Sequence, residues 1–300
     1  MEDIRLPNVI EELAAHRPVL TDGAWGTQLQ ARGLPIGACP DAWNLDRPHL
    51  VEEVARAYVA AGSRVILTNT FGASSLAVAR HGLADRAREI NRIGVEISRR
   101  AAGSAAKVFA SIGPTGKMLA MGEVSADEVR ASFLEQAEAM AEGGADAVVV
   151  ETMTDLEEAR LAVRAAVEAG LPVVACMVFD AGRNKDRTMM GVTPEQAVEA
   201  LLEAGATAVG SNCGVGAREM LGVCRRIRAA TSAPCWIKPN AGLPVLKDGR
   251  AVYQTTPQEF AEAAALLVDA GADFIGGCCG TGPEFIAALA KRLHQSGDRA

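Results

Sequence analysis

Two adjacent cysteines, Cys278 and Cys279, stand between glycines at the end of a short apolar run, 272–275. Neighbouring residues can form a disulfide only through a strained ring, so the pair is a poor structural disulfide. Two thiolates can instead bind one soft metal ion, which requires a third ligand from elsewhere in the fold. The alternative is that both are small buried residues packed close to a helix, because free cysteine is among the most buried residue types.

A weak internal repeat supplies the third candidate ligand. Four segments share a helix-ending glycine, an apolar run and then polar residues: 61–69, 143–151, 204–213 and 270–279. At equal distances beyond these glycines stand Asn69, Glu151, Asn212 and Cys278, and Cys213 and Cys279 come one residue later. If the segments are alternate strands of a parallel barrel, their C-terminal ends meet at one mouth. The repeat therefore predicts that Cys213, Cys278, Cys279 and Glu151 lie together.

Three thiolates without a dedicated fourth protein ligand are typical of a catalytic zinc site, because a closed structural site uses four ligands. The open position is then free for a substrate. Zinc surrounded by thiolates is a weak Lewis acid that suits the binding of another thiol. It lowers the pKa of that thiol from about 8.5 and keeps the sulfur nucleophilic at neutral pH.

Strand-like apolar runs alternate with helix-like segments along the whole chain. The expected strands are 18–20, 64–68, 107–111, 145–150, 172–178, 206–210, 234–238 and 272–275. The expected helices are 50–61, 84–102, 125–142, 155–169, 194–204, 216–230, 257–270 and 283–294. Cap-like residues precede several of them: Ser125, Asp155, Thr193 and Thr256.

This alternation has no break in composition and no long linker, so it predicts a parallel sheet with helices on its surface. Eight units predict closure into a single (β/α)₈ barrel over residues 1–300, with the active site at the C-terminal ends of the strands. The second-ranked architecture is a doubly wound open sheet.

Charge and composition exclude several classes of partner. The formal net charge of -7 argues against nucleic acids and anionic membranes, which bind basic surfaces. Residues 1–8 lack a basic start followed by an apolar stretch, and no apolar run is long enough for a transmembrane helix. We therefore expect a cytoplasmic protein. Seven cysteines in such a chain favour reduced thiols over a disulfide framework.

The remaining candidate residues are interpreted as structural. Cys39, Cys176, Cys224 and Cys235 are expected to pack in the core, and none of the four histidines is expected to bind metal. Gly214-Val215-Gly216 follows a strand as in a dinucleotide-binding loop, but Glu219 replaces the third glycine. No such cofactor is therefore predicted.

Motifs at seven predicted strand ends resemble the zinc-dependent homocysteine S-methyltransferases. This family includes betaine-homocysteine methyltransferase and the homocysteine-binding module of cobalamin-dependent methionine synthase. The resemblance covers nearly the whole chain. Its motifs are Thr21-Asp22-Gly23-Ala24-Trp25-Gly26-Thr27, Thr68-Asn69-Thr70-Phe71-Gly72-Ala73, Ser111-Ile112-Gly113-Pro114-Thr115-Gly116, Glu151-Thr152-Met153, Asn212-Cys213-Gly214, Lys238-Pro239-Asn240-Ala241-Gly242-Leu243-Pro244 and Gly276-Gly277-Cys278-Cys279-Gly280.

The resemblance implies a role for each matching position. Cys213, Cys278 and Cys279 correspond to the ligands of one Zn²⁺ ion, and the homocysteine sulfur completes the tetrahedron. Glu151 and Asp22 correspond to residues near the substrate ammonium. Backbone amides of the loops 22–26 and 70–73, which include Gly23, Ala24, Thr70 and Phe71, correspond to a carboxylate-binding site. Asn240 corresponds to a position close to the metal.

The implied reaction is transfer of a methyl group to the homocysteine thiol, which gives methionine. The donor is either a small sulfonium or quaternary ammonium compound or a methyl-corrinoid carried by a separate protein or another methionine synthase subunit. Two alternatives stay open. One is a thiol-binding zinc barrel that is inactive without a partner chain, and the other is a Schiff-base aldolase that uses Lys238.

Overall fold

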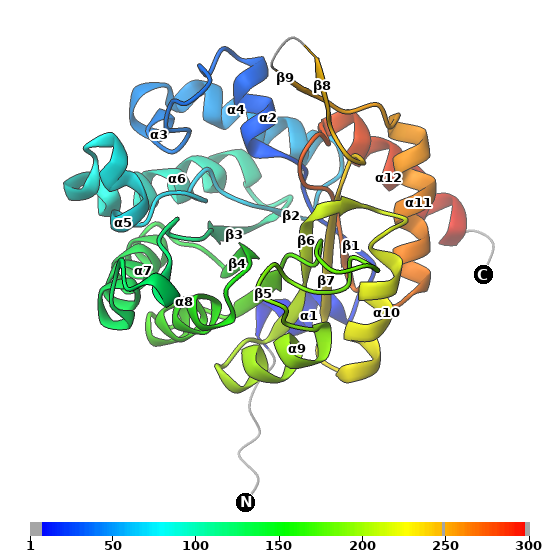
Figure 1. The fold of residues 1–300 in the computed structure, drawn as a ribbon. Helices are drawn as coiled ribbons and strands as arrows, with labels where there is room; N and C mark the ends of the chain where they lie inside the picture. The colour runs from blue at the N-terminus through cyan, green and yellow to red at the C-terminus, as the bar shows by residue number, and fades with distance from the viewer. Residues whose placement is uncertain (1–7, 248–249, 298–300) are drawn as a thin grey trace, which may run out of the picture.

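The computed structural model describes residues 8–247 and 250–297, and these contain one sheet of eight parallel strands. The strand order is β1-β10-β7-β6-β5-β4-β3-β2, and a parallel bridge between Thr21 and Val65 joins its two ends. Figure 1 shows these strands inside a ring of helices. The predicted barrel is confirmed, and the open sheet is wrong. The strands are β1 Val19–Leu20, β2 Val65–Ile66, β3 Lys107–Ile112, β4 Ala147–Met153, β5 Val173–Met177, β6 Ala208–Gly216, β7 Cys235–Asn240 and β10 Phe274–Ile275.

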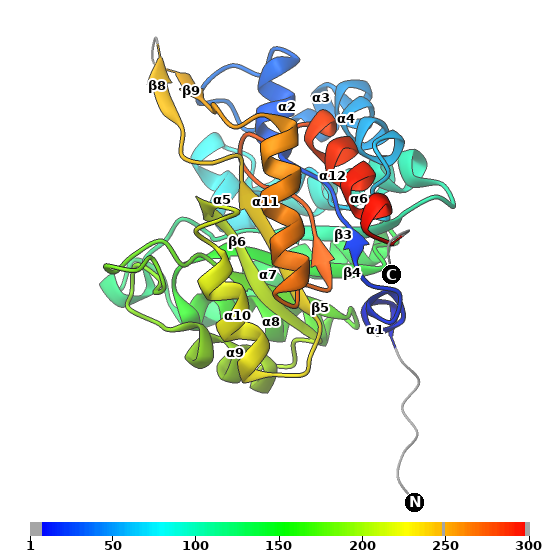
Figure 2. The same cartoon turned by 90° about the vertical axis from the view of Figure 1, so that its right-hand side faces the viewer.

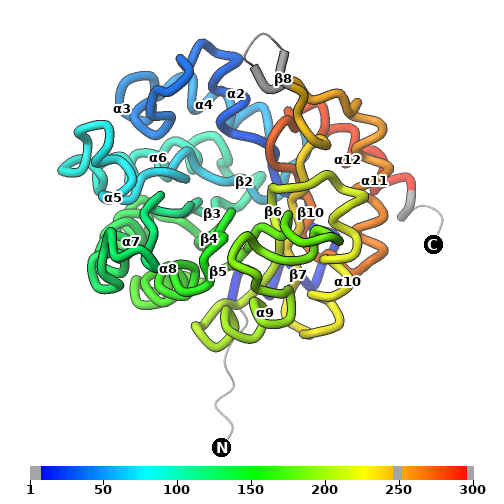
Figure 3. The backbone as a smooth tube through the Cα atoms, in the orientation of Figure 1, coloured from blue at the N-terminus to red at the C-terminus, as the bar shows by residue number. Residues whose placement is uncertain are grey.

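Helices surround the barrel, and the chain passes once around it, so that α12 returns to pack beside α4 (Figure 3). The helices are α1 Val9–Ala14, α2 Trp25–Ala31, α3 Trp43–Asp46, α4 Pro48–Ala60, α5 Ser75–Val78, α6 Ala87–Ala102, α7 Ala126–Glu142, α8 Leu156–Glu168, α9 Pro194–Glu203, α10 Leu221–Ala230, α11 Pro257–Asp269 and α12 Pro283–Gly297. Short 3₁₀ turns are η1 Ala79–His81, η2 Ala84–Arg86 and η3 Leu119–Met121.

The predicted helix starts are confirmed where a side chain caps the helix. Ser125, Thr193 and Thr256 each accept a bond from the N3 amide and form capping boxes, and Asp155 accepts from Glu157 and Glu158. The expected helix 216–230 begins late, at Leu221, because β6 continues in extended form to Gly216. That extension carries one of the candidate metal ligands past the barrel rim.

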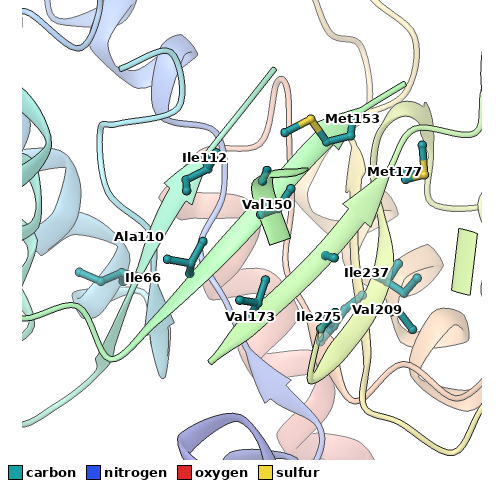
Figure 4. Close-up of a cluster of buried hydrophobic side chains, with 14 of the residues drawn as sticks. Ile66, Ala110, Ile112, Val150, Met153, Val173, Met177, Val209, Ile237 and Ile275 are labelled. Carbon is teal, nitrogen blue, oxygen red and sulfur yellow. The ribbon is translucent and has the colours of Figure 1, made fainter. Parts of the chain in front are cut away.

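Two layers of apolar side chains hold the barrel. Between strands and helices lie outward-facing residues such as Ile66, Val150, Val173 and Ile237 (Figure 4). Inside the barrel, the Trp236 ring lies between those of Phe109 and Phe274, with centroids 5.9 and 5.2 Å away. Rings from β3, β7 and β10 thus meet across the barrel interior and fill it as a packed core.

The two ends of the barrel differ. Helix α1 covers the N-terminal end and buries Ile10 in the interior cluster, whereas the hairpin of β8 Val245–Lys247 and β9 Arg250–Val252 projects from the opposite end (Figure 2). The loops after the strands thus form the open end. Among the described residues, no helix combines the length and apolar character that crossing a bilayer needs.

Gly210 of β6 allows the tight approach of β7, which predicts a large effect of substitution. A Cβ atom at this position would lie 1.8 Å from the carbonyl oxygen of Trp236. A backbone clash cannot be relieved by a rotamer change, so Gly210→Ala is expected to lower the free energy of unfolding by about 3 kcal/mol or more. Urea denaturation measures this. In the control, Gly222→Ala in α10, the new Cβ meets nothing within 4 Å, and a gain of about 0.5–1 kcal/mol is expected. Equal effects of the two substitutions on stability would contradict the role of Gly210 in the close approach of β7.

Candidate metal centre and substrate cavity

Bulges at the ends of β4 and β6 aim the candidate functional side chains. The β4–β5 register shifts between Val150 and Met153, and the β6–β7 register shifts between Asn212 and Gly216. Within these bulges Thr152 and Cys213 adopt positive φ angles of 62° and 63°. Such a conformation is uncommon for residues with a side chain and is typical of functional sites.

The three predicted thiols meet at the mouth of the barrel. The sulfur atoms of Cys213, Cys278 and Cys279, which we call the thiol cluster, all lie within 4.8 Å of one another. The Cys213 and Cys279 sulfurs are 3.8 Å apart. Zinc–sulfur bonds of about 2.3 Å in tetrahedral geometry place two sulfurs about 3.8 Å apart. The donor set and its spacing therefore fit one zinc ion.

Glycines allow the loop that carries Cys278 and Cys279 to pass between strands. A Cβ at Gly276 would lie 2.0 Å from the Thr21 hydroxyl, and one at Gly277 would lie 2.3 Å from the Thr281 hydroxyl. The backbone is fixed further because the Cys278 amide donates to the Pro239 carbonyl (2.8 Å). The two sulfurs are therefore held by a rigid backbone.

The thiols influence one another electrostatically. Hydrogen bonds from the Cys278 and Cys279 thiols lower the pKa of Cys213, whereas the bond to Cys213 raises the pKa of Cys278. The cluster thus favours one thiolate when no cation is near. A divalent cation would favour all three, because metal binding and thiol deprotonation are coupled.

Glu151 is held beside the cluster by two polar side chains. Glu151 is only 7% exposed. One carboxylate oxygen accepts from the Ser111 hydroxyl (2.5 Å), and the other accepts from the Asn212 amide (3.3 Å). Burial raises the pKa of Glu151, while the Lys238 ammonium and the Ser111 hydrogen bond act in the opposite direction. The sequence repeat did single out Asn212, and its role in orienting Glu151 emerges only from the structure.

Asp22 is fully buried, and both oxygens of its carboxylate accept hydrogen bonds. One oxygen accepts from the Lys238 ammonium (2.5 Å), and the other accepts from the Trp25 indole (2.8 Å) and the Leu67 amide (2.7 Å). Burial acts to lower the pKa of Lys238, but attraction from Asp22 and Glu151 outweighs it and raises the pKa. A Schiff-base lysine needs a lowered pKa, so this environment disfavours the aldolase alternative.

A cavity of about 600 Å³ opens beside the thiol cluster. This volume suits a small ligand with room for a second reactant. Of the predicted site residues, those that line it are Gly23, Ala24, Phe71, Glu151, Cys213, Cys278 and Cys279. Three amides of the two predicted carboxylate-binding loops already donate within the protein, namely those of Ala24, Gly72 and Ala73.

Thr70 and Asn240, two further predicted site residues, are not part of this cavity wall. The Thr70 hydroxyl is buried and donates to the Ser111 carbonyl (2.8 Å). Asn240 accepts from the Cys279 amide (3.0 Å) and lines a second cavity of about 390 Å³. Asn240 therefore orients the backbone of one candidate ligand, and its side chain also forms a hydrogen bond with Cys213 that lowers the Cys213 pKa. Cys39, Cys176, Cys224 and Cys235 are buried, as predicted for core cysteines.

Asp41 is a buried carboxylate in the cavity wall that the sequence did not single out. It is 4% exposed and accepts from the Gly72 amide (3.0 Å), and burial raises its pKa to about 6. Its loop, between α2 and α3, carries no strand or helix pattern that could have identified it. Arg80 lines the same cavity and acts to lower this pKa.

The raised pKa of Asp41 predicts a pH-dependent cost to stability. Between pH 4 and 6 the folded state binds more protons at Asp41 than the unfolded state, so this contribution to stability falls as pH rises. We compare the free energy of unfolding of Asp41→Asn with that of the parent protein at each pH. Between pH 4 and pH 7 this difference should shift in favour of the variant by up to about 3 kcal/mol. Urea midpoints at several pH values measure the difference. The exposed Asp46→Asn is the control, and a pH-independent difference for Asp41→Asn would contradict the prediction.

Comparison with known proteins identifies the relatives of this chain. A family model described as homocysteine S-methyltransferase matches residues 19–293. Proteins named methionine synthase from Mycobacterium leprae and Mycobacterium tuberculosis are 34% and 35% identical and match 96% and 94% of the chain. The chain spans about a quarter of the length of these relatives (25% of each).

A solved structure has the same architecture. The metallated form of the homocysteine methyltransferase MmuM from Escherichia coli superposes with a TM-score of 0.76 at 25% identity, over 91% of this chain and 96% of that one. This relative has nearly the length of the chain described above. The barrel thus occurs among its relatives both alone and as part of a longer protein.

Proposed function

This chain belongs to the homocysteine S-methyltransferase family, and we propose that it transfers a methyl group to the homocysteine thiol with one zinc ion bound to Cys213, Cys278 and Cys279. The observation that carries the proposal is the thiol cluster at the edge of a cavity that Glu151 also lines. Zinc held by three thiolates offers its open position to a substrate thiol and favours the ionised sulfur at neutral pH.

The protein's own residues would bind and orient homocysteine. Glu151 is fixed by Ser111 and Asn212, so its carboxylate is preorganised for the substrate ammonium. Asp22 is paired with Lys238 and is not part of the cavity wall, so we propose that it affects the ammonium only indirectly, by fixing the position of that lysine. The remaining amides of the loops 22–26 and 70–73 supply N–H donors for the substrate carboxylate.

Methyl transfer would then be a direct displacement. The homocysteine sulfur forms a bond to the methyl carbon, the bond between that carbon and the donor breaks, and the donor keeps the electron pair. The thiol proton leaves to solvent when the sulfur ionises, so no general-base triad is needed. The products are methionine and the demethylated donor.

One observation favours a donor brought by another protein. Exposed apolar side chains follow the C-terminal ends of β1, β2, β3, β5 and β7, and we call these the apolar rim: Ile36, Phe71, Met118, Met121, Met189, Met190, Leu243, Val245 and Val252. Apolar surface around a site is typical of protein contact, and methionines adapt to a partner. We therefore propose two candidate sources of the methyl group. One is a methyl-corrinoid protein or another methionine synthase subunit, and the other is a small sulfonium or ammonium donor.

A panel of donors tests the proposal. Purified protein with zinc and homocysteine is given S-methylmethionine, S-adenosylmethionine, betaine, methylcobalamin or methyltetrahydrofolate, and methionine is measured by mass spectrometry. Methionine from one donor supports the activity. Zinc and homocysteine binding without methionine from any donor would favour the barrel that needs a partner chain. Absence of both zinc and homocysteine binding would contradict the proposal.

A further inference from the structure

Lys238 is the one cation among the described residues that contacts the buried Asp22. Its ammonium lies 2.5 Å from the Asp22 carboxylate, and the two side chains are 2% and 0% exposed. The ammonium also lies over the Trp236 ring, 5.9 Å from its centroid. Two contacts of this kind hold the long side chain in one place, so the ion pair is a fixed part of the site.

Lys238 and Asp22 differ in their access to the cavity. Lys238 lines it together with Glu151, whereas Asp22 is not part of its wall. Among the described residues, the hydrogen bonds that Asp22 accepts come from Lys238, Trp25 and Leu67. A ligand in the cavity therefore meets the ammonium of Lys238 before the carboxylate of Asp22.

Among the residues that the structure describes, none forms such an ion pair with Glu151. The two side chains that donate hydrogen bonds to it, Ser111 and Asn212, are neutral, and Lys238 acts on it only as a nearby charge. A buried carboxylate without a cation in contact is costly, and an ammonium brought by a ligand removes that cost. The other carboxylate in the cavity wall, Asp41, is bound by the Gly72 amide and feels Arg80.

We propose that Lys238 is a specificity-determining residue: it neutralises Asp22, so that Glu151 alone receives a ligand ammonium, and it thereby sets how strongly the site prefers thiols that carry an amino group. This inference rests on the proposed function, because it concerns the same substrate. Without Lys238 the site would present two carboxylates to one ammonium. Without Asp22, Lys238 would turn to Glu151 and compete with the ligand.

Two opposite substitutions test this role. Zinc-loaded protein is titrated calorimetrically with homocysteine and with 4-mercaptobutyrate, which is homocysteine without its amino group. Lys238→Met should raise the preference for homocysteine at least about tenfold. Homocysteine carries an ammonium that can neutralise the two carboxylates, and 4-mercaptobutyrate does not. Asp22→Asn should lower that preference at least about tenfold, because Lys238 then occupies Glu151. The double variant should return to the ratio of the unmodified protein.

The outcomes separate this role from a structural one. A lysine that only stabilises the fold would weaken both ligands equally in both single variants, and that result would overturn the inference. If Lys238→Met fails to fold, the opposite shift in Asp22→Asn and its reversal in the double variant still decide. Failure of the unmodified protein to bind homocysteine would instead overturn the proposed function, and this role with it.

Discussion

Replacement of Cys213, Cys278 or Cys279 by alanine, one at a time, is expected to remove stoichiometric zinc and methyl transfer together. Each sulfur belongs to one cluster with separations below 4.8 Å, so each variant leaves only two thiolates for the ion. Loss of groups that merely orient ligands already weakens metal binding 10–100-fold, and loss of a ligand should exceed about 100-fold. Metal analysis of the purified protein and the rate of methionine formation measure the two effects.

Cys176→Ala is the matched control. Cys176 is buried in the barrel interior on β5 and belongs to the interior apolar cluster rather than to the thiol cluster. We expect this variant to keep its zinc and to lose about 1 kcal/mol of stability through the smaller side chain. Full zinc content and full activity in all three single variants of the thiol cluster would mean that its cysteines only pack.

The barrel and the residues at its mouth were predictable because both follow from repeating patterns in the sequence. Apolar runs of strand length alternate with capped helices, and equal spacing beyond four glycines predicted that Glu151 and the three cysteines share one end. The confirmed capping boxes at Ser125, Thr193 and Thr256 are local, within four residues of the chain. Local and periodic signals of this kind survive folding because tertiary contacts reinforce them.

Contacts between distant residues were not predictable. The bond from Lys238 to Asp22 joins β7 to the loop after β1, and nothing in either segment indicates the partner. The bulges that aim Cys213 and Glu151 arise from register shifts between paired strands, which single runs do not encode. Helix α1 was missed because its six residues are too few for a clear period, although Ile10 fills the barrel floor.

Glu151→Gln is expected to reduce kcat/KM for homocysteine about 150- to 5,000-fold. Glutamine keeps the length of the side chain and an acceptor for Ser111, but it removes the charge that would meet the substrate ammonium. An ammonium left unpaired in a buried site costs about 3–5 kcal/mol, which corresponds to this range. Most of the change should appear in KM, because the contact already exists before the methyl group moves.

Two comparisons distinguish this loss of charge from general damage to the fold. Turnover of 4-mercaptobutyrate, which has no ammonium, should change less than about threefold in Glu151→Gln, because no charge pair is lost. Glu158→Gln is the matched control: Glu158 is also buried, but it accepts from the Thr115 amide and hydroxyl and is not part of the cavity wall. It should keep the KM for homocysteine. An equal loss for both thiols, or an equal loss in Glu158→Gln, would place the ammonium contact on a residue other than Glu151.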